Sequence, residues 1–446
     1  MASKEHDFSV GSIPRNIISL ALPMTAAQLI NVLYSVVDRI YLGRLPGHLA
    51  LTGLGLTLPI ISIVMGFANL CGTGGAPLCS IYRGKGEEEE AERIMGNAFT
   101  LLLIFGAAVT GVFLLFRHPL LYLFGASDAT YPYAEAYMTI YLLGTVFVMI
   151  GLGMNPFITS QGFGRTGMMT VGLGAVVNIV LDYLFIAVLG WGIAGAALAT
   201  ALGQALAAVA AVAFFASSKT SRLRFARPTA DFRALGKTCV NGSSELMTEV
   251  AASVVSMLYN YQLMMIAGAD GVAAYGVIMY VNFIFTAVFF GFAMGTGPIV
   301  SYHYGARNTG ELKGLFRKSF TLVGGTGLAM FAASQLLAAP LVGVFVGYDP
   351  ELAAMTLHGF RIYAVSFLVC GFNIYGSAFF TALNNGKVSA LISFMRTLVF
   401  ETSTVMLLPI VWGIDGVWSA IIVAEACALV LTTFFLVYLR KPYGYA

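Results

Sequence analysis

The sequence predicts an all-α membrane protein of twelve transmembrane helices, built as two six-helix repeats with the same orientation. Three observations predict this class. The 446 residues are 58% hydrophobic and only 10% charged, whereas soluble domains carry roughly 25% charged residues. Apolar stretches of about 18 residues or more, long enough to cross a bilayer, recur along the whole chain. Two glycine-containing motifs also return at one constant offset.

The predicted helices follow the apolar runs in order. The longest loop, 217–235, carries five basic residues and separates an N-terminal half, 1–216, from a C-terminal half, 236–446. We expect each half to form one six-helix lobe. The helices are predicted at 14–43, 49–78, 94–117, 131–159, 167–189, 192–216, 236–268, 271–304, 313–338, 352–383, 387–411 and 415–439.

The distribution of basic residues predicts the orientation in the membrane. With the N-terminus placed inside, 20 of the 24 Lys and Arg residues lie nearer the inner side. Short cytoplasmic loops are enriched in Lys and Arg. Both termini are therefore expected in the cytoplasm, and the short polar segment 1–11 does not resemble a cleavable signal peptide. The four basic residues nearer the outer side are Arg39, Arg44, Arg117 and Arg361.

An internal repeat supports the two-lobe organisation. A shift of 221 residues superposes both motifs, which lie more than 100 residues apart. Because each half contains an even number of predicted helices, the copies are parallel repeats, an arrangement that places a substrate path between them. The matched motifs are Gly74-x-x-Pro77-x-x-Ser80-x-x-x-Gly84 with Gly295-x-x-Pro298-x-x-Ser301-x-x-x-Gly305, and Trp191-Gly192-Ile193-x-Gly195 with Trp412-Gly413-Ile414-x-Gly416.

Ionisable side chains inside the predicted helices are the candidate functional residues. A charge at the centre of a bilayer is unfavourable by at least about 2.5–3.5 kcal/mol on insertion scales, so each such residue needs a partner or a function. For Glu401 and Glu425, helix packing or pairing between helices is as reasonable as transport. The six acids in this class are Asp38, Asp182, Glu245, Glu249, Glu401 and Glu425.

The spacing around Trp191 predicts a cation or proton site in the first lobe. Asp182 lies nine residues before Trp191 and Thr200 nine residues after it, so both lie about 13 Å from this turn in an antiparallel helix pair. Asn178 is one turn from Asp182 on the same helix face. Asp38 lies toward the outer end of the first helix, in the same half of the membrane. These oxygens suit Na+ or a proton; the alternative is a set of polar packing contacts, with Asp38 paired to Arg39 or to an interfacial group.

The second half lacks this oxygen-rich set. At the repeat offset, Asp38 corresponds to Tyr259, Asn178 to Val399 and Asp182 to Ser403. This asymmetry favours a single coupling site in the first lobe. Gln204 is the counterpart of Glu425.

Several motifs resemble the multidrug and toxic compound extrusion (MATE) family, and most closely its bacterial MepA-like branch. The resemblance covers essentially the whole chain. It is carried by Val36-Val37-Asp38-Arg39-Ile40-Tyr41-Leu42-Gly43, Asn178-Ile179-Val180-Leu181-Asp182, Gly195-Ala196-Ala197-Leu198-Ala199-Thr200 and Gly305-Ala306-Arg307.

The resemblance implies a V-shaped pair of lobes that alternates between inward-open and outward-open forms. It implies an antiporter that exports organic cations and other drugs in exchange for Na+ or H+, in a bacterial or archaeal inner membrane. It brings the helices carrying Asp38 and Asp182 together. It also gives Pro23, in the middle of the first helix, a role in a bend linked to the ion state, although a static kink is the alternative.

The predicted helix 236–268 carries Glu245 and Glu249, one turn apart on one face. They are candidates for binding a cationic drug or a second proton, and the family often has a functional acid in this helix. The alternative places them in solvent near Lys237. Methionine and tyrosine side chains such as Met24, Met65, Met257 and Met265 are candidates for an adaptable drug cavity.

Other functions are less compatible with the sequence. A lipid-linked precursor flippase of related architecture would need a cavity rich in Arg or Lys. A membrane-embedded enzyme is disfavoured because HExxH, GxSxG, CxxC and Walker A patterns are absent from the sequence, and a non-transporting receptor would not need buried acids. We expect a monomer that contacts membrane lipids and small-molecule substrates, needs no cofactor and, with a net charge of +3, binds no nucleic acid.

Overall fold

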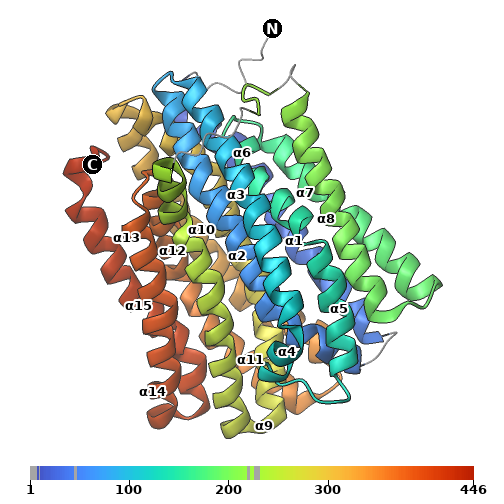
Figure 1. Ribbon diagram of the computed structural model, residues 1–446. Helices are drawn as coiled ribbons and strands as arrows, with labels where there is room; N and C mark the ends of the chain where they lie inside the picture. Colours follow the sequence, from blue (N-terminus) through green and yellow to red (C-terminus); the bar gives the residue numbers. More distant parts are fainter. Residues whose placement is uncertain (1–7, 10, 45–47, 218–220, 226–231) are drawn as a thin grey trace.

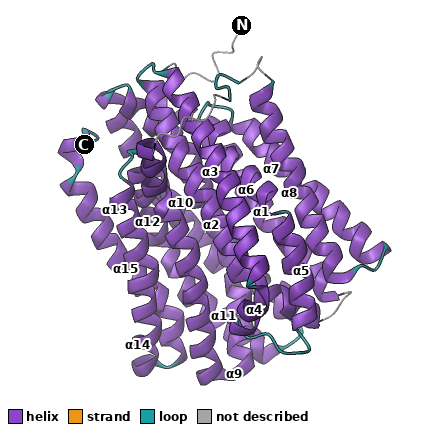
Figure 2. Ribbon diagram, in the orientation of Figure 1, coloured by secondary structure: helices purple, strands orange, loops and turns teal. Residues whose placement is uncertain are grey.

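The computed structural model describes residues 8–9, 11–44, 48–217, 221–225 and 232–446. All regular secondary structure in these ranges is helical (Figure 2). The all-α fold class is therefore confirmed. Phe8 packs on Tyr302, and Tyr443, near the C-terminus, packs on the neighbouring Tyr304. The described ends of the chain therefore lie at the same end of the helical bundle (Figure 1), as an even number of membrane crossings requires.

The first half of the chain forms six predicted spans. Two of them are interrupted: α5 and α6 meet at a bend of 57°, and α7 passes directly into a π-helical segment at Tyr183–Val188. A short helix, α4 (Arg117–Leu123), lies between the third and fourth spans. The remaining bounds are α1 (Ile13–Arg44), α2 (His48–Gly84), α3 (Glu88–Leu115), α5 (Tyr131–Leu143), α6 (Thr145–Thr159), α7 (Gly164–Asp182) and α8 (Gly192–Ala216).

The second half repeats this plan. Its fourth span is divided by a 3-10 turn at Ala364–Ser366, and its fifth span contains a π-helical segment at Phe394–Glu401. The bounds are α9 (Phe232–Gly305), α10 (Thr309–Val346), α11 (Pro350–Tyr363), α12 (Phe367–Ala382), α13 (Gly386–Ser393), α14 (Thr402–Trp412), α15 (Ile414–Tyr438) and α16 (Arg440–Tyr443).

The helix α9 contains two of the predicted spans. Its 74 residues would extend about 110 Å as one straight helix, far more than the roughly 30 Å of a hydrocarbon core. Gly268 breaks it with a left-handed backbone (φ 66). Ten helices in the described residues are long and apolar enough to cross a membrane, and the bent pair α5–α6 makes eleven. With α9 divided at Gly268, every one of the twelve predicted spans has a helical counterpart.

Several predicted boundaries were wrong. The helix α2 continues to Gly84, beyond the predicted end at 78, and α3 begins at Glu88 instead of 94. The acidic side chains of Glu88, Glu89 and Glu90 therefore form the first turn of α3, where negative charge interacts favourably with the helix dipole. The predicted linker 217–235 ends earlier, because α9 begins at Phe232; its residues Lys219 and Arg227 lie outside the described residues.

Two hydrophobic cores follow the two halves of the chain. One consists of buried residues from α2 to α8, together with Leu42 of α1 and Leu223 of the linker. The other consists mainly of residues from α9 to α15, but it also includes Ile17 and Leu20 from the first turns of α1. The helix α1 thus contributes to both cores, at its opposite ends.

The lobes meet through glycine at the end of the bundle that holds the chain termini. A Cβ atom at Gly242 of α9 would overlap the carbonyl oxygen of Leu70 in α2. In the same way, a Cβ atom at Gly305 would overlap the Ile81 carbonyl. These positions tolerate no side chain, because the two backbones are in direct contact there.

Candidate functional site

The first-lobe acids lie where the sequence predicts them. Asp182 is the last residue of α7, directly before the π-helical segment, and it is fully buried. Asp38, near the end of α1, is 8% exposed, and its charge interacts with that of Asp182. One carboxylate oxygen of each residue, Oδ1, is buried without a hydrogen-bond partner among the described residues. An unpaired buried carboxylate is strongly unfavourable, so this pair needs a proton or a cation.

Asn178 and Thr200 lie beside Asp182. In the amide orientation that suits both neighbours, the Asn178 nitrogen donates to Asp182 Oδ2 at 3.2 Å and its oxygen accepts from the Thr200 backbone N–H at 3.2 Å. The predicted group of four residues is thus brought together. The group is not a cage made of oxygens alone. Asn178 donates a hydrogen bond to Asp182 and so orients this carboxylate, while the Asn178 oxygen accepts from the Thr200 backbone of α8.

Tyrosine and glutamine side chains surround the acidic pair. Tyr34 lies one turn before Asp38 and interacts with both Asp38 and Gln204. Tyr137 interacts with Asp38 and with the Thr200 hydroxyl. These hydroxyl and amide groups are sources of hydrogen bonds close to the carboxylates. Gln204 and Tyr137 were not predicted for this site, because they lie on α8 and α5, helices distant in sequence from Asp38.

Arg39 does not neutralise Asp38 by an ion pair. Its guanidinium lies over the Tyr280 ring of α9, 5.3 Å from the ring centroid, in a cation–π contact. The described residues contain no salt bridge that involves Asp38 or Asp182. The alternative in which Asp38 is paired to Arg39 does not fit this arrangement.

A central cavity of about 320 Å³ lies between the lobes. This volume lies at the lower end of the range typical of sites for drug-sized ligands. Its walls include Glu245 and Glu249 from the first half of α9, so both of these acids face the space between the lobes. They do not lie in solvent beside Lys237. The first-lobe wall supplies four amides, at Gln28, Asn31, Asn69 and Asn155.

The predicted methionine lining is correct in part. Met24 and Met65 line the central cavity, together with Met294, which the sequence analysis did not single out. By contrast, Met257 and Met265 are not among the residues that line it; Met265 is 71% exposed on the outer half of the first span of α9. Helical periodicity alone could not separate the cavity face from the outer face.

A small chamber of about 20 Å³ extends from this cavity into the first lobe. The two spaces share Asn31, Gly151, Leu152 and Val171 as wall residues, and the chamber reaches Tyr34 and Gln204. A space of this size holds one water molecule. Tyr34, which lies one turn before Asp38 on α1, is therefore adjacent to the drug-sized cavity, although Asp38 itself does not line it.

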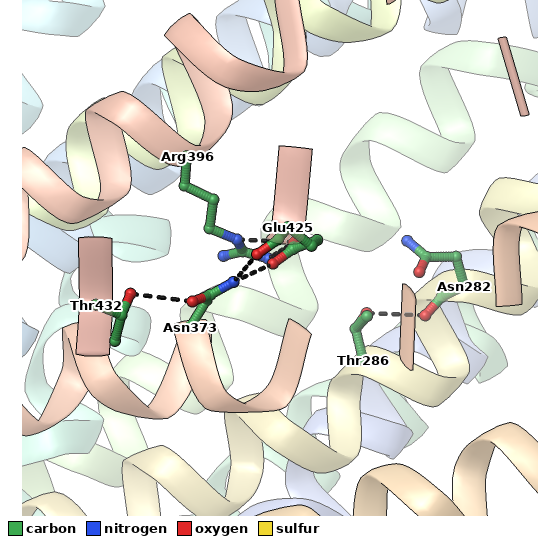
Figure 3. Close-up of polar contacts among 6 residues, drawn as sticks. All are labelled: Asn282, Thr286, Asn373, Arg396, Glu425 and Thr432. Atoms are coloured by element: carbon green, nitrogen blue, oxygen red, sulfur yellow. Dashed lines mark hydrogen bonds and ion pairs between the residues drawn. The ribbon is translucent and has the colours of Figure 1, made fainter. Parts of the chain in front are cut away.

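The second lobe contains a different buried acid. Glu425 of α15 accepts hydrogen bonds at Oε1 from Arg396 Nε (2.8 Å) and Nη2 (2.7 Å), and at Oε2 from the Asn373 side chain (2.6 Å). The Asn373 oxygen accepts in turn from the Thr432 hydroxyl at 3.0 Å (Figure 3). Both carboxylate oxygens are thus saturated. Arg396 pairs with Glu425, as one of the two alternatives predicted, while Asn373 and Thr432 were missed.

Glu401 lies close to this network. It ends the π-helical segment that also carries Arg396, and it lies near Glu425, Arg396 and Tyr259. The Tyr259 hydroxyl is buried without a hydrogen-bond partner among the described residues. Tyr259 is the repeat counterpart of Asp38. The second lobe therefore has a tyrosine beside a glutamate at the place where the first lobe has two aspartates.

Pro23 lies within α1, next to Met24, which lines the central cavity. It is also close to the interlobe contact, since Gly291 and Gly295 of α9 pack on Thr25 and Ala21 of α1. A bend at Pro23 would thus move a cavity wall and an interlobe contact together.

Comparison with known proteins identifies the family. The MatE family model matches twice, over residues 23–184 and 246–406. The multidrug export protein MepA of Staphylococcus saprophyticus is 23% identical over 97% of this chain and 95% of its own length, and MepA of Staphylococcus haemolyticus is 24% identical over 97% and 94%. A solved structure described as the outward-facing conformation of a multidrug resistance MATE family transporter has the same fold (TM-score 0.94, 21% identity, all of both chains covered). The chain therefore belongs to the MatE family and is a multi-pass membrane transporter, not an enzyme.

Proposed function

We propose that the protein exports amphipathic organic cations in exchange for an inward-moving H+ or Na+ ion, by alternating access between its two lobes. One observation carries this proposal: two neighbouring buried carboxylates, Asp38 and Asp182, each have an oxygen without a partner among the described residues. Such a pair takes up a cation or a proton readily. The names of the MepA relatives support export of several drugs.

The cargo site in this proposal is the central cavity. Glu245 and Glu249 would attract a positively charged group, while Met24, Met65 and Met294 would pack against its apolar part. Methionine side chains adapt to ligands of different shape. Asp38 and Asp182 do not line the cavity, so the ion and the drug would occupy separate sites.

Coupling between separate sites requires that the ion favour one arrangement of the lobes. The chamber beside Tyr34 and Gln204 shares wall residues with the cavity, and α1 carries both Asp38 and Pro23. We infer that an ion at Asp38 and Asp182 alters α1 near Pro23 and thereby the cavity wall at Met24. Linkage then requires that the drug lower ion affinity by the same factor by which the ion lowers drug affinity.

The flippase alternative is not favoured by the composition of the cavity. Among the described residues that line it, Arg396 is the one basic residue, and Glu425 already pairs with it, whereas two acids face the same space. A pyrophosphate head group would require more positive charge.

Liposome flux tests the proposal. Purified protein would be reconstituted, and movement of ethidium, an organic cation, would be followed under an imposed Na+ or proton gradient. We expect transport under one of these gradients and its loss in Asp182→Asn. Asp270→Asn, which makes the same chemical change at an exposed position, is the matched control. Ethidium transport by Asp182→Asn at the normal rate under the same gradient would contradict the proposal.

Orientation in the membrane can be tested by cysteine labelling. Arg224 is exposed on the linker, whereas Ser221 is buried and donates to the Gln161 side chain, so Arg224→Cys is the better probe. Tyr348, 82% exposed between α10 and α11, is its counterpart at the opposite end. In a background without the exposed Cys427, we expect an impermeant reagent to label Tyr348→Cys but not Arg224→Cys in intact cells. The reverse pattern would overturn cytoplasmic termini.

A further inference from the structure

The part of the second-lobe wall formed by α12, α13 and the π-helical segment differs chemically from the acidic part formed by α9. Arg396 lines the cavity together with three hydroxyl side chains, from Ser377 and Thr381 of α12 and Ser393 of α13. All four groups can donate hydrogen bonds. This wall therefore presents donors, in a cavity that otherwise suits cations.

Arg396 is only partly used by Glu425. Its side chain is 19% exposed, whereas that of Glu425 is 2% exposed. Glu425 occupies one edge of the guanidinium, formed by Nε and Nη2. Nη1 makes no hydrogen bond to any residue that the structure describes, and in Figure 3 it points away from the carboxylate. A guanidinium has five N–H donors, so its end-on edge, Nη1 with the second hydrogen of Nη2, remains available for a second acceptor.

The hydroxyl groups extend this donor surface. Ser377 Oγ lies 3.0 Å from Ser393 Oγ and 2.8 Å from Ser389 Oγ, and Ser389 Oγ lies 2.7 Å from Thr381 Oγ1. Each hydroxyl donates one hydrogen bond but accepts up to two. When Ser377 donates to Ser393, the Ser393 hydrogen is free to reach a ligand beside Arg396, which is three residues away.

We propose that Arg396 and Ser393 form a subsite for a carboxylate group of the transported molecule. End-on pairing of a guanidinium with a carboxylate gives two parallel hydrogen bonds and high geometric specificity. Because Glu245 and Glu249 face the same cavity, a ligand with an ammonium group and a carboxylate at its two ends would satisfy both walls. The preferred cargo is thus an amphoteric molecule, a narrower class than organic cations. This inference rests on the proposed function of the cavity.

A matched pair of dyes tests the subsite. Rhodamine B carries a cationic ring system and a carboxylate, and in its ethyl ester an uncharged ester group replaces the carboxylate. Binding of each dye to purified protein in lipid nanodiscs would be measured by fluorescence anisotropy. We expect the wild-type protein to bind rhodamine B about tenfold more tightly than the ester, since charge-assisted hydrogen bonds are lost in the ester.

The diagnostic variant is Arg396→Lys. Lysine keeps the charge beside Glu425 but cannot present a bidentate edge, so we expect it to weaken rhodamine B binding more than ester binding and thereby to abolish the preference for rhodamine B. Arg317→Lys, at an exposed position of α10, is the matched control and should keep the preference. Thermal unfolding of each variant checks that the fold is retained.

The outcomes separate this inference from the proposed function. Equal binding of both dyes by the wild-type protein, or an equal loss for both in Arg396→Lys, overturns the carboxylate subsite. If the ester is nevertheless bound and is transported in liposomes, the proposed export of cations stands. If the wild-type protein binds neither dye, the assigned role of the cavity fails, and the subsite fails with it.

Discussion

The two lobes hold buried acids in contrasting states. In the first lobe, Asp38 and Asp182 lie side by side, and each has an oxygen without a partner among the described residues. In the second lobe, Glu425 is saturated by Arg396 and Asn373. Both groups adjoin a π-helical segment in the fifth span of their lobe, a feature frequent at functional sites.

The comparison indicates that the Glu425 carboxylate holds helices together, whereas the Asp38 and Asp182 carboxylates are suited to binding an ion. A carboxylate that already has a guanidinium and an amide gains little from an added proton or cation, so Glu425 is suited to fixing helices against one another. Two adjacent carboxylates with free oxygens gain much from the same ion. Duplication produced equivalent frameworks, and the two lobes then use their buried charge for different purposes.

The largest expected effect is on transport by Asp182→Asn. Removing this charge leaves nothing for an ion to bridge, while the amide retains hydrogen bonds to its neighbours. Because coupling between sites typically amounts to 1–3 kcal/mol, we expect gradient-driven export to fall by about 5–150-fold. Thermal stability should be unchanged or higher. A large loss of stability would show that Asp182, like Glu425, mainly stabilises the fold.

Glu425→Ala should show the opposite pattern. It leaves the Arg396 guanidinium buried without its partner, and breaking a buried pair in this way lowers the free energy of unfolding by about 3–5 kcal/mol. Thermal unfolding in detergent would measure the loss. The double variant Arg396→Met with Glu425→Leu removes both charges and should regain most of the stability. A normal melting temperature for Glu425→Ala would show that the pair is not structural.

A smaller effect is expected from Glu249→Gln. This change removes one negative charge from the cavity, so the affinity for a cationic dye should fall about tenfold, as expected for loss of a charge-assisted hydrogen bond. Equilibrium binding to purified protein would show it, and Glu245→Gln would reveal which of the two acids contributes more. Unchanged binding in both variants would show that Glu245 and Glu249 do not belong to the cargo site.

The smallest expected effect is on the rate of switching. Pro23→Ala restores a helix hydrogen bond, so the protein should be no less stable, yet export should slow severalfold with near-normal drug binding. Ser244→Ala, at the counterpart position in the second lobe, is the control and should transport normally. A parallel loss of binding and stability in Pro23→Ala would indicate a static kink.

Much of the fold could be predicted because the membrane spans and the repeat are encoded in short, local sequence patterns. Long apolar runs define the spans, and the repeat offset alone relates Gly74 to Gly295. The depth of Asp182 and Thr200 followed from counting residues to Trp191, since helix rise is constant. Their meeting with Asn178 needed only an antiparallel helix pair.

What could not be predicted depends on departures from regular helices. The π-helical segments rotate the side chains that follow them, so the direction of Arg396 and Glu401 could not be derived from a regular period. The partners Asn373 and Thr432 are uncharged residues on other helices, and a sequence offers many such candidates. Likewise, Met265 and Met24 have the same chemistry, and only packing places one outside and the other at the cavity.

The glycine contacts between the lobes also bear on the proposed alternating access. Where Gly242 meets Leu70 and Gly305 meets Ile81, the nearest atoms across the contact are backbone atoms. Ordering a flexible side chain typically opposes association by up to about 1.5–2 kcal/mol, and a glycine has no side chain to order. If the lobes part and rejoin at this end, as the proposal requires, the contacts at Gly242 and Gly305 would re-form without that loss of entropy.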